Sequence, residues 1–380
     1  VGEPQGGTFG TNKGLQTKYG VNRVRNTPIS ESAIIGAAIG SSIAGMNPIA
    51  EIMFCDFMGV CLDQIANHAA KQRYMSGSAT HAPMTIRMQL GGGMGGFGAQ
   101  HSQSLEAWLT HVPGIKVLYP SNPIDAKGML LSAINDPDPV VMLESIMLLF
   151  TQKAQVPTGD YRIPLGVAKV CREGSDVTLI SYGWELHNCL AAAEELAKDG
   201  ISAEVIDLRS LVPIDYYRVL ESVKKTGRAV VVHAAVEFCG LGAEICSTIN
   251  EELWGQLKAP AVRLGAAYAP MAYSSAIEFS QVPDAGAITA HAQGLEAGLR
   301  PPGGFDSDSA FAVDVVTGNQ QVDRVLADGF FGAVPIGDLG TRTPVDDATV
   351  GIGGEKGVGA RLKCINQDWS GHGSGRARGR

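Results

Sequence analysis

A single carboxylate, Glu31, stands where a buried charge could do chemistry. It follows the extended stretch 26–30 and precedes a run of small and apolar residues, 32–40. Pro28 and Ser30 favour the end of an extended segment, and Ser30 is a suitable N-cap, so the run predicts a helix with Glu31 in its first turn. The helix dipole stabilises a carboxylate there, whereas apolar surroundings penalise the charge unless a partner pairs with it. Glu31 is therefore either an ordinary helix-start residue or a carboxylate held ready for a bound partner.

His101 is the second candidate, because it follows a stretch with six glycines at residues 90–98. The stretch comes after an apolar strand pattern, but it lacks the Gly-Lys-Ser/Thr ending of a phosphate-binding P-loop and the setting of a dinucleotide fingerprint. Glycines let the backbone approach a ligand closely, so the loop favours presentation of His101 to a bound molecule. A helix-capping or core histidine is the alternative that the loop alone leaves open.

Other familiar catalytic signatures do not occur in this sequence. No Ser-His-Asp or Cys-His signature is present, and the eight histidines lack the spacing of zinc ligands. The seven cysteines include no Cys-x-x-Cys pair and mostly have apolar neighbours, which is typical of reduced, buried thiols and indicates a cytoplasmic protein. Chemistry in this chain would therefore need a carboxylate, a histidine and a bound group.

Composition argues against two classes of partner. The chain has 380 residues, 45% of them hydrophobic and 18% charged, with a formal net charge of −8. An acidic balance without a basic stripe argues against nucleic acid, and no run reaches the roughly 18 apolar residues of a membrane span. The chain opens on Val1 inside a glycine-rich stretch with no signal-peptide pattern, so we expect a missing amino-terminal piece.

The elements that must position Glu31 and His101 alternate between short apolar strands and helical patterns. The strand patterns cover residues 48–54, 83–87, 116–119, 139–144, 176–181, 203–207 and 229–233. The helical patterns cover residues 61–73, 122–134, 186–198, 216–225, 243–254 and 284–294. Such alternation predicts the α/β class, with two domains that each contain a mostly parallel sheet with helices on both faces.

Changes in composition indicate the domain boundaries. We expect a first domain at residues 1–155 and a second at residues 176–300. The polar, turn-rich residues 156–175 between them read as a linker. Residues 301–380 are rich in Gly and Asp with weak periodicity, which predicts a poorly ordered or atypical tail.

Seven motifs together resemble those of a known family. They are Thr27-Pro-Ile-Ser-Glu31, Glu51-Ile-Met-Phe-Cys-Asp-Phe57, Leu62-Asp-Gln-Ile65, Ala99-Gln-His-Ser-Gln103, Val112-Pro-Gly-Ile-Lys-Val117, Asp125-Ala-Lys-Gly128 and Asp207-Leu-Arg-Ser-Leu211. Through them the stretch from Gly6 to Leu295 resembles the beta subunit of the thiamine-diphosphate-dependent decarboxylating component of 2-oxo acid dehydrogenase complexes. That resemblance implies a transketolase-like pyrimidine-binding domain followed by a transketolase C-terminal-like domain.

The resemblance also assigns roles around the cofactor. Glu31 would bond to the aminopyrimidine ring of thiamine diphosphate and favour its protonation, so that the exocyclic amine takes the proton of the thiazolium carbon as an imine. Ile29 would line the ring and Phe57 would stack on it. His101 would face the thiazolium and assist proton transfer and reductive acylation of a lipoyl group.

Ions and partners follow from the same resemblance. The family often binds potassium on main-chain oxygens, and the matching positions are Met84, Ala133, Ile134, Asp136 and Asp138. A separate alpha subunit holds the diphosphate and its magnesium through a Gly-Asp-Gly motif, which does not occur in this sequence. We therefore expect an alpha2-beta2 heterotetramer that is active only when assembled and passes acyl groups to a lipoylated acyltransferase core.

The substrate and two other function classes stay open at this point. Residues 56–64 and 74–77 favour the acetoin and pyruvate branches over the branched-chain one. A nicotinamide (NAD)-dependent oxidoreductase would need a Gly-x-Gly-x-x-Gly turn between a strand and a helix, and none occurs in that setting. A non-catalytic or degenerate scaffold subunit is the other alternative, against which the presence of Glu31, Phe57 and His101 argues.

Overall fold

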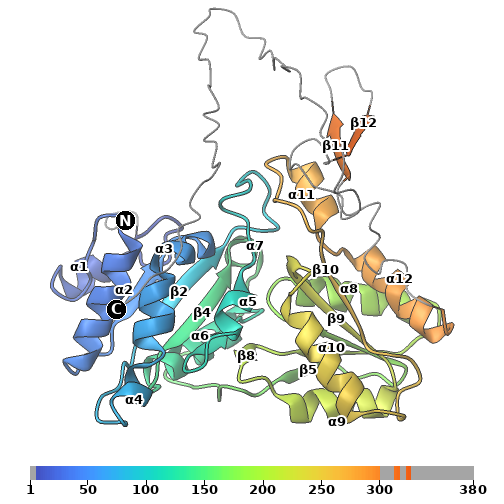
Figure 1. Cartoon of the computed structure of the whole chain (residues 1–380), viewed down its shortest axis with the longest axis horizontal. Helices are drawn as coiled ribbons and strands as arrows, with labels where there is room; N and C mark the ends of the chain where they lie inside the picture. The colour runs from blue at the N-terminus through green and yellow to red at the C-terminus, as the bar shows by residue number, and fades with distance from the viewer. Residues whose placement is uncertain (1–5, 300–311, 317–321, 327–380) are drawn as a thin grey trace, which may run out of the picture. The chain divides into compact units, whose positions relative to one another are not determined.

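A computed structural model describes residues 6–299, 312–316 and 322–326 of the chain. Two five-stranded sheets with helices packed against them carry the candidate residues (Figure 1). The first sheet has the order β1-β2-β4-β3-β8. Its strands are β1 (Ile49–Ile52), β2 (Thr85–Leu90), β3 (Lys116–Leu118), β4 (Val140–Ser145) and β8 (Ser210–Val212). All neighbours run parallel except β8, which is antiparallel to β3.

The second sheet repeats this plan with the order β10-β9-β6-β7-β5. Its strands are β5 (Lys169–Arg172), β6 (Val177–Ser181), β7 (Ala203–Asp207), β9 (Ala229–Val236) and β10 (Val262–Ala266). Only the edge strand β5 is antiparallel, to β7. The predicted α/β class with two mostly parallel sheets is therefore confirmed.

Helices connect the strands in both halves of the chain. In the first half they are α1 (Leu15–Tyr19), α2 (Glu31–Ile43), η1 (Cys55–Phe57), α3 (Met58–Asp63), η2 (Gln64–Ala69), α4 (Gln72–Met75), α5 (Glu106–Thr110), α6 (Pro123–Ile134) and α7 (Ile146–Thr151). In the second half they are α8 (Glu185–Lys198), α9 (Tyr216–Thr226), α10 (Leu241–Glu252), α11 (Ser275–Gln281) and α12 (Ala285–Glu296).

Alternate residues of the second sheet bury opposite faces. Val177 and Leu179 of β6 belong to the same hydrophobic cluster as residues of α8 and α12. Ile180 points to the other face, where it shares a cluster with residues of α9 and α10. That second cluster continues into the first sheet and α2, so one apolar core extends across both halves of the chain. A period of two along each strand produces this division, because successive side chains point to opposite faces.

One predicted helix is wrong in its continuity. Residues 61–73 read as a single helix, whereas the structure has α3, the π-helical turn η2 and then α4. The backbone of Cys61 is non-helical, with φ −120° and ψ 16°. Cys61, Ile65 and Ala69 are nevertheless all buried. Their four-residue spacing keeps the apolar period intact across the breaks, which is why the sequence pattern does not reveal them.

Three edge strands of the two sheets lie where the sequence indicated none: the parallel β10 and the short antiparallel β5 and β8. β5 falls inside residues 156–175, the segment predicted as a linker, and its side chains are only partly buried. β8 follows β7 in the chain but pairs with β3 of the first sheet. Both are three or four residues long and antiparallel, so neither shows the long apolar run of a buried parallel strand.

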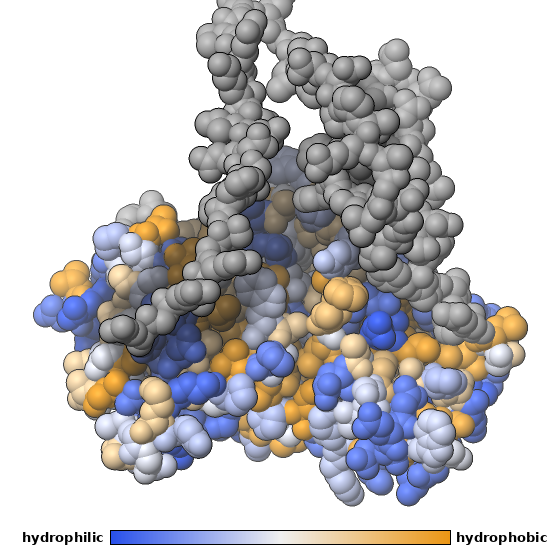
Figure 2. All heavy atoms as spheres, in the orientation of Figure 1, coloured by the Kyte–Doolittle hydropathy of each residue, from blue (hydrophilic) through white to orange (hydrophobic). Residues whose placement is uncertain are grey.

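Little of the predicted tail can be compared with the structure. β11 (Ala312–Val316) and β12 (Val322–Leu326) form an antiparallel pair, and residues 300–311, 317–321 and 327–380 lie outside the described residues. Within the described part, no helix has the length and apolar content needed to cross a membrane. In the coloured part of Figure 2, hydrophobic residues are interspersed with hydrophilic ones, as expected for a folded protein surface.

Candidate active site

His101 and Phe57, two of the predicted site residues, meet in one aromatic cluster. Their ring centroids lie 5.4 Å apart in an edge-to-face arrangement. Phe54 lies at the centre of the cluster, 4.8 Å from His101 and 6.3 Å from Phe57. Phe9 and Phe97 add further edge-to-face contacts to Phe54, at 5.4 Å and 5.6 Å. Such pairs fix ring orientation, so this cluster restricts where the imidazole can point.

The cluster lies where strands of a parallel sheet end. Phe54 and Phe57 follow the carboxyl end of β1, and the glycine loop that leads to His101 follows the carboxyl end of β2. Ligands of α/β proteins bind outside the carboxyl ends of the strands. The two segments therefore deliver their side chains to the edge of the sheet where a bound molecule is expected.

Glu31 begins α2, as the sequence predicts, but Ser30 does not cap it. Ser30 occupies the N-cap position without a side-chain capping hydrogen bond. The Glu31 side chain is 9% exposed. Among the described residues it forms no hydrogen bond or ion pair. Its carboxylate oxygens are not fully enclosed, so the group stays open to a ligand that enters from solvent.

Helix packing connects Glu31 to the aromatic cluster. α2 packs against α3, and the Ser32 hydroxyl donates to the carbonyl of Val60 at 2.7 Å. α3 begins directly after Phe57, and the Cys61 thiol donates to the Phe57 carbonyl at 3.9 Å. Burial, followed by the charge of Glu31, raises the pKa of the Cys61 thiol to about 12. The carboxylate thus lies close enough to α3 to influence it, and Cys61 stays a neutral thiol.

Hydrogen bonds between Asp56 and Gln103 fix the chain two residues after His101. The Asp56 Oδ1 atom accepts hydrogen bonds from the Gln103 backbone at 3.2 Å and from its side-chain amide at 2.8 Å. Burial raises the pKa of the Asp56 carboxyl, against the hydrogen bonds from Gln103 and the charge of His101. Neither residue has a role that the sequence alone predicts, although both lie inside motifs that carry the resemblance.

A buried ion network ties the amino-terminal segment to the same edge of the sheet. Arg87 forms two hydrogen bonds with the carboxylate of Glu144, at 2.6 and 2.7 Å, and a third with Glu51 at 3.2 Å. Asn12 donates to Glu51 at 2.7 Å, three residues after Phe9 reaches the aromatic cluster. A charged residue in the middle of the buried strand β2 was the available signal, because such a charge requires a partner.

Ile29 and the predicted potassium positions are less closely tied to this arrangement. Ile29 is 68% exposed, two residues before α2.

The five potassium positions gather at the amino ends of β2 and β4, where the carbonyl of Met84 accepts a hydrogen bond from the backbone N–H of Val140 at 3.0 Å. The carbonyls of Ala133 and Ile134 also accept hydrogen bonds, from Asp136 N–H and from the Asn47 side chain. The side chains of Asp136 and Asp138 form ion pairs with Lys116 and Arg73. A carbonyl oxygen has two lone pairs, so a carbonyl that accepts one hydrogen bond can still bind a cation.

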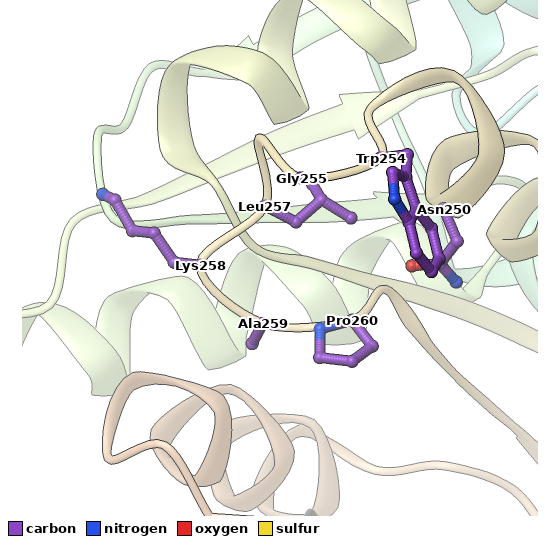
Figure 3. Close-up of a pocket in the computed structure, with 7 residues that line it drawn as sticks. All are labelled: Asn250, Trp254, Gly255, Leu257, Lys258, Ala259 and Pro260. Carbon is purple, nitrogen blue, oxygen red and sulfur yellow. The ribbon is translucent and has the colours of Figure 1, made fainter.

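A surface pocket of about 450 Å³ has no part in this site. It is lined by Asn250, Trp254, Gly255, Leu257, Lys258, Ala259 and Pro260 (Figure 3). These residues come from the end of α10 and the turn before β10. None of the predicted site residues lines it.

Two known domain families match successive parts of the chain. Residues 2–151 match the family described as the pyrimidine-binding domain of transketolase, and residues 166–288 match its C-terminal domain. A solved structure titled split gene transketolase, inactive beta4 tetramer, has a similar fold, with a TM-score of 0.62 at 24% identity. The match covers 76% of this chain and 89% of that one, and it bears on the fold alone.

Curated relatives are more similar in sequence. The chain is 46% identical to the beta subunit of acetoin:2,6-dichlorophenolindophenol oxidoreductase from Cupriavidus necator, over 76% of this chain and 84% of that protein. It is 45% identical to the beta subunit of the pyruvate dehydrogenase E1 component from Bacillus subtilis, over 69% and 80% of the two chains.

Proposed function

This chain belongs to the transketolase-like family of acetoin and pyruvate dehydrogenase beta subunits, and we propose that it completes a thiamine-diphosphate site together with an alpha subunit. The observation that carries the proposal is Glu31, a nearly buried carboxylate at the start of α2 without a protein partner. The relatives are named as beta subunits acting on acetoin or pyruvate, and these two compounds are the substrates that we propose here.

The residues at this edge of the first sheet fit the pyrimidine half of the cofactor. Glu31 offers a carboxylate to the ring nitrogen, and Phe57 offers an aromatic face. When bound, thiamine diphosphate supplies the electron sink for breaking the carbon–carbon bond next to the substrate carbonyl. A carboxylate in apolar surroundings interacts more strongly with a protonated ring than it would in water, so Glu31 would hold the ring in its protonated form.

His101 would act as the proton carrier of the same site. An imidazole ring can both accept and donate a proton through its nitrogens. Contacts with Phe54 and Phe57 orient the ring, and the hydrogen bonds from Gln103 to Asp56 fix the chain two residues further on. The side chain would transfer a proton during cleavage and during acylation of the lipoyl group.

Assembly completes the site in this proposal. An alpha subunit would supply the diphosphate and magnesium contacts in an alpha2-beta2 heterotetramer, and a lipoylated acyltransferase would accept the acyl group. A potassium ion on the carbonyls of Met84, Ala133, Ile134, Asp136 and Asp138 would join the amino ends of two strands. Ile29 would line the edge of the pyrimidine ring, and its exposed side chain would pack against that ring.

Glu31→Gln in the assembled enzyme tests the proposal. Gln keeps the shape and removes the charge, so we expect lipoamide acylation to fall by at least ~10²-fold, the low end of what a positioned acid–base group contributes. The Tm should change little. If Glu31 is only a helix-start residue, the variant loses about 0.3–1 kcal/mol of stability and keeps its turnover. Normal acylation with a lowered Tm contradicts the assignment.

A further inference from the structure

We propose that Glu278 in α11 is a positioning residue for His101, because its carboxylate holds the glycine loop that carries this histidine. The inference deepens the proposed function and rests on it for the role of His101. The contact itself joins two matched regions of the chain, since His101 lies in the pyrimidine-binding region and Glu278 in the C-terminal region.

The Glu278 carboxylate meets the loop directly. Its Oε1 atom accepts a hydrogen bond from the backbone N–H of Gly93 at 2.8 Å, across 185 positions of sequence. The side chain is fully buried, and its Oε2 atom has no hydrogen-bond partner in the described part of the chain. Burial raises the pKa of this carboxyl, against the hydrogen bonds from Gly93 and Gly95. A buried carboxylate that accepts hydrogen bonds from backbone N–H groups of a loop fixes the backbone of that loop.

The loop fits against the second half of the chain only because it is made of glycine. A Cβ atom on Gly93 would lie 3.1 Å from the Trp184 indole, and one on Gly95 would lie 2.5 Å from Ser275. The N–H group of Gly96 donates to the carbonyl of Tyr273 at 3.1 Å. The segment from Tyr273 to Glu278 therefore forms a cradle for the loop.

The same loop determines where His101 lies. The His101 N–H group donates to the carbonyl of Gly98 at 3.2 Å. A Cβ atom on Gly91 would overlap the carbonyl oxygen of His101, so the first residue of the loop packs on the backbone of the histidine. Gly93, two residues further on, carries the hydrogen bond to Glu278. A shift of the loop at this point moves the backbone of His101.

Three variants of Glu278 and one matched control separate the possible roles. Glu278→Ala removes the acceptor, and Glu278→Asp withdraws it by one methylene. Glu278→Gln keeps an acceptor oxygen for Gly93 and loses the charge. Glu204 is the control because it is also buried and accepts a backbone N–H, from Gly174 at 3.3 Å. Gly174 lies between β5 and β6, outside the His101 loop.

Hydrogen exchange on the full chain without cofactor measures the contact. A single hydrogen bond contributes about two- to tenfold to a local opening equilibrium. We expect Glu278→Ala and Glu278→Asp to speed exchange in a peptide covering residues 91–101 by about that factor. Glu278→Gln and Glu204→Ala should leave this peptide unchanged. Unchanged exchange of this peptide in both Glu278→Ala and Glu278→Asp would overturn the proposal. If Glu278→Ala does not fold, the exchange rate in Glu278→Asp alone tests it.

Activity in the assembled enzyme measures the consequence. A displacement of about 1 Å at a catalytic group costs on the order of 10²-fold in rate, so Glu278→Ala should lower the kcat of lipoamide acylation by about that factor. Glu278→Gln should keep most of the wild-type kcat. The double variant Glu278→Ala with His101→Ala should be no slower than His101→Ala alone, because the two residues act as one unit. Multiplying losses would contradict positioning through His101. Full activity in His101→Ala would instead remove the proposed role of His101, and the exchange result would still decide whether Glu278 holds the loop.

Discussion

The buried glutamates Glu31, Glu278 and Glu185 differ in the hydrogen-bond partners of their carboxyl groups, and we infer their different roles from these partners. The Glu31 side chain has no hydrogen bond or ion pair within the described residues, and the Glu278 carboxylate accepts the backbone N–H of Gly93 in a loop. Glu185 at the start of α8 is 1% exposed and accepts a hydrogen bond from Asn188 at 3.0 Å. Of these three, Glu31 is the one without a protein partner within the described residues. Glu185 is a structural group whose burial affects stability.

The pH dependence of stability should reflect Glu185. Burial raises its pKa to about 8, against the hydrogen bond from Asn188. The folded state therefore holds a proton that the unfolded state has released, so stability is present below the ordinary carboxyl pKa and falls as pH rises toward 8. The free energy of unfolding should fall by about 1.4 kcal/mol per pH unit near pH 6.5 to 7 for this group, and by about half as much near pH 8, where half of the folded molecules have lost the proton.

Denaturant titrations of wild type and Glu185→Gln across that pH range check this prediction. Buried Asp207 contributes a similar fall only up to a pKa of about 7. His233, whose pKa burial lowers to about 4, acts below pH 6.5 and in the opposite direction. The glutamine variant should therefore lose the share of the slope that Glu185 contributes above pH 7, whereas Glu106 and Glu278, whose carboxyl pKa values burial also raises, keep theirs. Parallel curves for the two proteins would show that Glu185 is not the titrating group.

At the scale of elements, the local sequence pattern predicts the long, apolar helices and strands. It fails for elements whose structure depends on a contact with a distant part of the sequence. β7 and α6 begin and end within one residue of their predicted bounds because their apolar runs are local signals. Asn122 is another local signal, since its side chain caps α6 by accepting a hydrogen bond from the backbone of Asp125. β8 has no such signal, since only its pairing with β3 makes it a strand. In the site, Glu278 has no local mark of its role because the loop that it holds lies 185 positions away.

Two neighbouring glycines of the loop test how it docks. Gly95 and Gly96 both have positive φ, +77° and +84°, so alanine at either position pays the cost of left-handed backbone, about 1–2 kcal/mol. Only at Gly95 would the new Cβ also meet Ser275, at 2.5 Å, whereas nothing lies within 4 Å at Gly96. Gly95→Ala should therefore be less stable than Gly96→Ala by roughly 1–3 kcal/mol, the cost of overpacking.

Chemical unfolding of the two variants, with m-values compared, provides the measurement. Acylation in the assembled enzyme should follow the same order, because the clash pushes the loop away from the cradle that places His101. Equal stabilities would mean that the loop does not pack on Ser275 in solution.

At the scale of the whole molecule, we propose that this chain supplies one part of an active site that an alpha subunit completes. One apolar core extends from the first sheet into the second, and the loop and Glu278 join the two matched regions at the candidate site. The carboxylate, aromatic ring and imidazole gathered there suit a pyrimidine and a proton transfer. The Gly-Asp-Gly motif expected for the diphosphate does not occur in the sequence. We therefore expect cofactor affinity to be a property of the assembly.

Calorimetric titration of thiamine diphosphate with magnesium tests this central claim most directly. This chain alone, the alpha subunit alone and their mixture are titrated under one condition, with a mixture containing Glu31→Gln as the control. We predict no tight binding by this chain alone, tight binding by the mixture together with turnover of pyruvate or acetoin, and weaker binding in the control. Tight, magnesium-dependent binding by the isolated chain would contradict the account.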